Sequence, residues 1–75
     1  MRIDGAETII KALLGEIVAK LQQAEHVARA AQACAGAGGI PEAIHVSLDL
    51  DQTVYDVGRL HDSVTLLARL ARDEE

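Results

Sequence analysis

Apolar residues in the first half of the chain recur alternately four and three positions apart, which is the heptad spacing of a helix that packs along one face. The predicted seam of this first arm contains Ile10, Leu14, Ile17, Leu21, Ala24, Ala28, Ala31 and Ala35. Acidic residues precede basic residues by four positions at Glu7–Lys11, Glu16–Lys20 and Glu25–Arg29, the order that stabilises a helix. With an Asp-x-x-Glu start signal at Asp4, this pattern predicts a helix over about 4–35.

The second half of the chain allows two interpretations over residues 44–50. Apolar and polar side chains alternate there, as in a half-buried strand, but a heptad fits the same residues and continues beyond them. The heptad gives a second seam of Ala43, Val46, Leu50, Thr53, Val57, Leu60, Val64, Leu67 and Ala71. When the arms fold together, this seam matches the first from Ala35 opposite Ala43 to Ile10 opposite Leu67. An isolated strand would have no strand to pair with, so we predict a helix over about 41–72.

The segment between the arms combines a helix stop with a helix start. Gly36 suits the left-handed position after a helix, and Pro41 suits the first turn of the next one. Glu42 adds a carboxylate near the positive end of the second helix dipole. A loop over 36–40 is short enough to make the two helices antiparallel neighbours. The sequence therefore predicts an all-α fold, an antiparallel helical hairpin in a single domain over 1–75.

Such a hairpin leaves apolar residues outside its seam. A chain of 75 residues with one Tyr and no Phe or Trp has little with which to build a core of its own. We expect the flanking side chains to form an interface, which comprises Leu13, Val18, Ile44, Leu48, Val54, Tyr55 and His61. The prediction is a homodimer that forms a four-helix bundle. This plan resembles that of the Rop family of small dimeric hairpin proteins.

The net charge of −5, with scattered basic residues, disfavours nucleic acid and anionic membrane surfaces as partners. No apolar run approaches the roughly 20 residues that a membrane-spanning helix needs. The N-terminus lacks a signal-peptide pattern, so we expect a cytoplasmic protein. The single cysteine, Cys34, excludes an internal disulfide and is predicted to be a small core residue.

One motif suggests chemistry: the sequence Leu48-Asp49-Leu50-Asp51-Gln52-Thr53-Val54. It resembles the first motif of the haloacid dehalogenase superfamily, an apolar strand followed by Asp-x-Asp-x-Thr/Val. The resemblance implies that Asp49 attacks a phosphoryl group, that Asp51 is the acid and base, and that magnesium offsets the negative charge. The alternative function is therefore a small metal-dependent phosphotransfer module.

The histidines do not complete a metal site in this pattern. His26 and His45 point outward in the heptad frame, and His61 flanks the seam. His45 and Asp49 are four positions apart and could share a metal, but two ligands are too few for a specific site unless a dimer doubles them. We predict no catalytic, cofactor or metal site. The favoured function is a non-enzymatic regulatory or adaptor protein that contacts itself, and a larger protein partner, through its helices.

Overall fold

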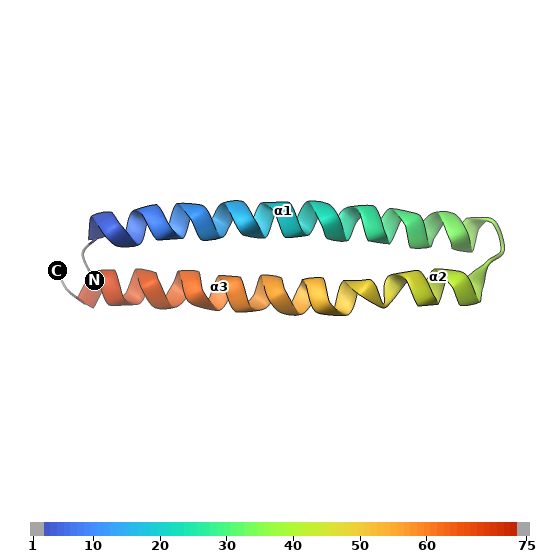
Figure 1. Ribbon diagram of the computed structural model, residues 1–75. Helices are drawn as coiled ribbons and strands as arrows, with labels where there is room; N and C mark the ends of the chain where they lie inside the picture. The colour runs from blue at the N-terminus through green and yellow to red at the C-terminus, as the bar shows by residue number, and fades with distance from the viewer. Residues whose placement is uncertain (1–2, 74–75) are drawn as a thin grey trace.

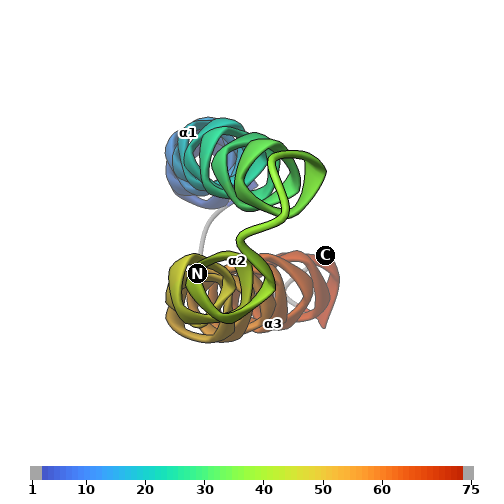
Figure 2. The ribbon, with the colours of Figure 1, turned by 90° about the vertical axis from the view of Figure 1, so that its right-hand side faces the viewer.

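Two helical arms of similar length lie side by side in antiparallel directions (Figure 1). The structure is a computed structural model that describes the backbone of residues 3–73 and the side chains of residues 5–73. Helix α1 (Ile3–Gly36) forms the first arm, and helices α2 (Ile40–Ser47) and α3 (Asp49–Asp73) follow one another along the second. Viewed from the loop end, the arms are two layers joined by one crossing connection (Figure 2). The predicted all-α helical hairpin is confirmed.

The second arm is helical where the sequence alternates. Residues 44–50 contain no strand, and the helical interpretation of this segment is confirmed. The prediction of one uninterrupted helix over about 41–72 differs from the structure at Leu48, which separates α2 from α3. Leu48 keeps right-handed helical angles, with φ −62° and ψ −26°, so the arm continues in nearly the same direction.

Local hydrogen bonds explain this interruption. The N–H of Leu48 donates to the His45 carbonyl at 3.2 Å, and the N–H of Asp51 donates to the Leu48 carbonyl at 3.2 Å. Both bonds span three residues, which is tighter than the four of an α-helix. The Ser47 hydroxyl also donates to the Ile44 carbonyl at 2.7 Å, and such side-chain bonds compete with the helical pattern.

The loop closes α1 with a glycine in the left-handed conformation. This residue is Gly38, with φ 89°, whereas the predicted Gly36 is the last residue of α1. The N–H of Gly39 donates to the Cys34 carbonyl at 2.8 Å, and that of Gly38 donates to the Ala35 carbonyl at 3.0 Å. These two bonds are those of a Schellman motif, which requires its left-handed residue at the position of Gly38.

The start of α2 is closely packed against the end of α1. A Cβ atom on Gly39 would lie 3.0 Å from the Glu42 Oε2 and 3.3 Å from the Cys34 carbonyl oxygen, so glycine permits this approach. Pro41 lies in the first turn of α2, where its missing N–H leaves no hydrogen bond unmade. Glu42 is also in the first turn, where its charge complements the helix dipole.

The seam of the second arm contains the residues that its heptad pattern selects. Ala43 and Ala71 are buried at its two ends. Between them the half-buried residues are Val46, Leu50, Thr53, Val57, Leu60, Val64 and Leu67, with Ser47 and Asp56 beside them. These side chains face α1, and each retains some contact with solvent.

The seam of α1 differs from the predicted one at alternate positions. Its least exposed residues are Ala6, Ile10, Leu13, Ile17, Lys20, Ala24, Val27, Ala31 and Cys34, with Ala35 beside the loop. Leu13 therefore lies in the seam, and the predicted seam residues Leu14 and Leu21 are exposed. Ala28, which the predicted seam also included, is exposed as well. The helix is rotated so that Lys20, and not Leu21, faces the second arm.

The core of the isolated hairpin is thin. Within the described residues, the buried hydrophobic side chains are the alanines Ala6, Ala43 and Ala71, and no large side chain is fully buried. Two helices can enclose only a line of contact between them, so each larger residue in the seam stays partly wet.

Candidate functional site

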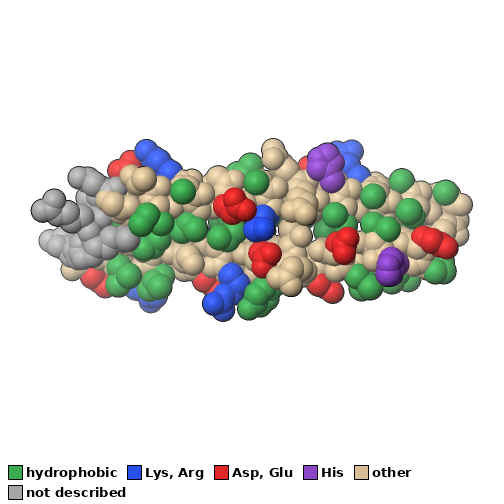
Figure 3. Space-filling view, in the orientation of Figure 1, with side chains coloured by type: hydrophobic (Ala, Val, Ile, Leu, Met, Phe, Trp, Pro, Cys, Tyr) green, Lys and Arg blue, Asp and Glu red, His purple; other side chains and the backbone are tan. Residues whose placement is uncertain are grey.

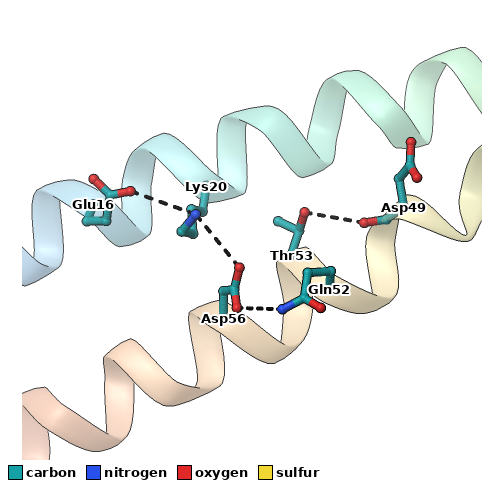
Figure 4. A network of polar contacts seen from close by, with 6 residues as sticks. All are labelled: Glu16, Lys20, Asp49, Gln52, Thr53 and Asp56. Carbon is teal, nitrogen blue, oxygen red and sulfur yellow. Dashed lines mark hydrogen bonds and ion pairs between the residues drawn. The ribbon is translucent and has the colours of Figure 1, made fainter.

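A polar network crosses between the arms near the middle of the hairpin (Figure 4). The Lys20 Nζ lies 3.8 Å from the Glu16 Oε1 on its own helix and 3.8 Å from the Asp56 Oδ2 on α3. Asp56 also accepts a hydrogen bond of 2.8 Å from the Gln52 Nε2. About a third of the Lys20 and Asp56 side chains is exposed, at 29% and 34%. This ion pair places Lys20 and Asp56 at the same level along the hairpin.

The network defines one side of the hairpin, which we call the polar side. Glu16 marks this side on α1, and Asp56 marks it on α3. Residues seven positions apart lie on the same side of a helix in such a pair, so other residues of the polar side can be found by counting from these two. The middle of the polar side also carries Gln23, Asp49 and Ser63. In the space-filling view, a basic side chain lies among acidic ones where the two arms meet (Figure 3).

The opposite side has a hollow near the chain termini. The hollow has a volume of about 490 Å³ and is lined by Ala6, Glu7, Ile10, Lys11, Ala68, Ala71 and Arg72. Glu7 and Lys11 lie just outside the seam of α1, and Ala68 and Arg72 just outside that of α3. These four residues mark the second side of the hairpin, away from the Lys20 network.

Four exposed apolar residues continue along this second side. Leu14 and Leu21 follow Glu7 by one and two heptads, Val18 follows Lys11 by one heptad, and Val54 precedes Ala68 by two. We call them the leucine face, which consists of Leu14 (46% exposed), Val18 (54%), Leu21 (52%) and Val54 (64%). Side chains this large and exposed, gathered near the middle of the hairpin from α1 and α3, form a surface suited to another apolar surface.

The remaining predicted interface residues fall into three places. Ile44, four heptads before Arg72, and His61, one heptad after Val54, are exposed on the same side as the leucine face. Leu48 and Tyr55, one heptad apart, are more than half exposed along the outer edge of the second arm. Leu13 is the exception, because it packs in the seam with the second arm.

The sequence-based assignment overlooked Lys20 as a seam residue and placed Leu14 and Leu21 inside. A signal for the correct arrangement exists in the adjacent leucines Leu13 and Leu14. When a helix carries apolar residues at three of every seven positions, either edge of its apolar stripe can pack against a given neighbour. Here one edge packs within the hairpin, and the other edge forms the leucine face.

The residues considered for chemistry do not gather into one site in the described part of the chain. Asp49 and Asp51 are exposed in the first turn of α3, and side chains two apart on a helix do not face each other. The strand that precedes these aspartates in the haloacid dehalogenase motif is here a helix. His26 and His45 are exposed, and Cys34 is half-buried in the seam. In residues 3–73, no three His, Cys, Asp or Glu side chains are grouped to hold a metal ion.

Comparisons with models of protein families, with curated proteins and with solved structures give no match. Over the described part of the chain, no helix has the length and apolar character to cross a membrane. The leucine face is therefore the feature of the hairpin that bears most directly on function.

Proposed function

We propose that this protein is a non-enzymatic regulatory or adaptor protein whose hairpin self-associates into a four-helix bundle through the leucine face. One observation carries the proposal: the leucine face is about half exposed, while no large side chain in the described residues is fully buried. A second copy would supply the apolar surroundings that the hairpin lacks.

The exposed area supports an interface of ordinary size. The chain of 8.0 kDa has an accessible surface of 5470 Å². A compact monomer of this mass typically exposes about 4,500 Å², so the hairpin exposes about 1,000 Å² more. A stable interface buries about 800 Å² on each partner. Association through one side would therefore lower the accessible surface of each chain to about that of a compact protein of the same mass.

The width of the apolar stripe supports the same arrangement. Helices of four-helix bundles carry apolar residues at three of every seven positions, because each helix contacts two neighbours. In α1 the seam residues Leu13 and Ile17 serve the first neighbour, α3. Leu14 and Leu21 are available for the second neighbour, which the proposal assigns to the partner copy.

The outer edge of the second arm supports the adaptor part of the proposal. Leu48 and Tyr55 point away from α1 and from the leucine face, so dimerisation through that face would leave them uncovered. Together they offer a larger protein a place to dock a helix. The net charge of −5 favours a basic partner.

Two leucines with the same exposure provide a matched test by light scattering. Leu14 and Leu66 are both 46% exposed, but Leu66 lies one turn before Leu70, on the polar side. We expect the unmodified chain and Leu66→Glu to be dimers, and Leu14→Glu to be a helical monomer, because only Leu14 would bury its charge. Circular dichroism checks that all three stay helical. Equal masses for the two variants would contradict the assignment of the leucine face.

A further inference from the structure

We infer that the two copies pack leucine face to leucine face with their loops at opposite ends, so that each α1 lies against the partner's α1. This inference rests on the proposed self-association and specifies its geometry. Two closed arrangements satisfy a two-fold axis between stacked hairpins. In one the loops lie at opposite ends and like arms pair, and in the other the loops share an end and α1 pairs with the partner's second arm.

The charges on α1 are arranged symmetrically about Val18. Lys11 precedes Val18 by one heptad and Glu25 follows it by one heptad, so all three lie along the same side of the helix. At about 1.5 Å per residue, the two charges stand about 10 Å from Val18 in opposite directions. Leu14 and Leu21 fill the space between them.

Placing the loops at opposite ends pairs these charges favourably. With the two-fold axis at Val18, Val18 meets the partner's Val18 and Leu14 lies beside the partner's Leu21. Lys11 then lies level with the partner's Glu25, and the symmetry repeats this contact. Lys11 and Glu25 now make exposed ion pairs with Glu7 and Arg29 on their own helix, at 3.1 Å and 2.8 Å. The Lys11 side chain is 74% exposed and that of Glu25 is 62% exposed, so both can also reach the partner copy.

Placing the loops at one end opposes like charges. Counting from the Lys20–Asp56 pair, Glu25 is five residues along α1 and Asp51 is five residues back along α3, so they share a level. Asp51 precedes Arg72 by three heptads and therefore lies on the side of the leucine face. Glu25 would then face the partner's Asp51, and the two-fold axis would repeat this repulsion on the other copy. Leu21 would still meet the partner's Val54, so apolar packing alone does not separate the two arrangements. Glu25 favours the first arrangement, in which it faces the partner's Lys11 and not the partner's Asp51.

Cross-linking tests the arrangement directly, in a Cys34→Ala background that removes the native thiol. Val18→Cys should form a disulfide-linked dimer on mild oxidation, because the two copies of residue 18 meet at the axis. Ala19→Cys, the neighbouring exposed position, should not. If Val18→Cys chains fail to link to one another but link to Gly58→Cys chains, the loops share an end and the inference is wrong. A monomer in sedimentation would instead remove the proposed function itself.

Charge exchange gives an independent test by the dimer dissociation constant. Lys11→Glu should weaken the dimer about tenfold, because two attractions become two repulsions. Glu25→Lys should act similarly, and the double variant should recover most of the affinity. Arg59→Glu is the control, since Arg59 is exposed, lies one heptad before Leu66 on the polar side, and its replacement changes the net charge equally. Equal weakening by Lys11→Glu and Arg59→Glu, or no recovery in the double variant, would overturn the inference.

Discussion

Replacing Lys20 with leucine should stabilise the hairpin, although it removes the ion pair that joins the two arms. Lys20 occupies a seam position between Ile17 and Ala24, level with the half-buried Val57. A leucine there would continue the apolar seam where the natural chain places an ammonium group. The expected change combines a gain in apolar burial with a loss of two weak ion pairs.

The magnitude follows from the exposure of the side chains. Fully burying a leucine contributes about 1.5–3 kcal/mol, and a residue with the 29% exposure of Lys20 would gain most of that. The lysine stem already covers part of the seam, which reduces the gain to about 2 kcal/mol. Each ion pair, at 3.8 Å and partly solvated, contributes about 0.5 kcal/mol. Asp56 keeps its solvent contact and its hydrogen bond from Gln52. The net expectation is a stabilisation of about 1 kcal/mol.

Urea unfolding followed by circular dichroism, at one protein concentration, measures this change. Lys20 lies on the polar side, so the variant should leave association through the leucine face unaltered. Arg29→Leu is the control, because it also removes an ion pair with an acidic residue four positions earlier, at an exposed site. We expect Arg29→Leu to change stability by less than about 0.5 kcal/mol. If Lys20→Leu destabilises the protein or matches the control, Lys20 does not lie in the seam and the rotation of α1 is incorrect.

Three further outcomes test other parts of the structure. Leu60→Ala should lower the free energy of unfolding by about 2 kcal/mol, because Leu60 is half-buried and such a site lies at the low end of the cost of replacing a buried leucine by alanine. A loss below about 0.5 kcal/mol would place Leu60 at the surface. Gly38→Ala should lower the free energy of unfolding by about 1 kcal/mol, because Gly38 has a φ of 89°. Gly36→Ala should be neutral or stabilising, because Gly36 is helical and has open space around it. The reverse order of the two effects would contradict the Schellman closure. Magnesium titration followed by NMR should leave Asp49 and Asp51 without selective shifts, and saturable shifts at both would favour the phosphotransfer alternative.

Rules that act over a few residues made much of the hairpin predictable. The three acid–base pairs expected from their spacing occur in α1, with Glu25 and Arg29 as close as 2.8 Å. The glycine-rich loop, with Pro41 in the first turn of α2, marked the turn between the arms. The exact closure, with Gly38 and not Gly36 left-handed, depends on how far α1 continues, and helix ends are weakly specified by sequence.

The rotation of α1 could not be derived from its own sequence. Leu13 and Leu14 are equally apolar, and the choice between them is made two turns later by Lys20 and Leu21. Apolarity favoured Leu21 at the seam. The structure instead places the lysine stem there, because Asp56 on the other arm receives its ammonium group. A contact between residues this far apart in the chain leaves no periodic signal in either arm.

In the proposed four-helix bundle, a second copy covers the leucine face. Sedimentation equilibrium of the unmodified chain, over a hundredfold range of concentration, tests it most directly. Dimerisation through the leucine face predicts a mass that approaches twice 8.0 kDa as the concentration rises. A mass that stays at 8.0 kDa over the whole range, with the helices intact, would contradict it.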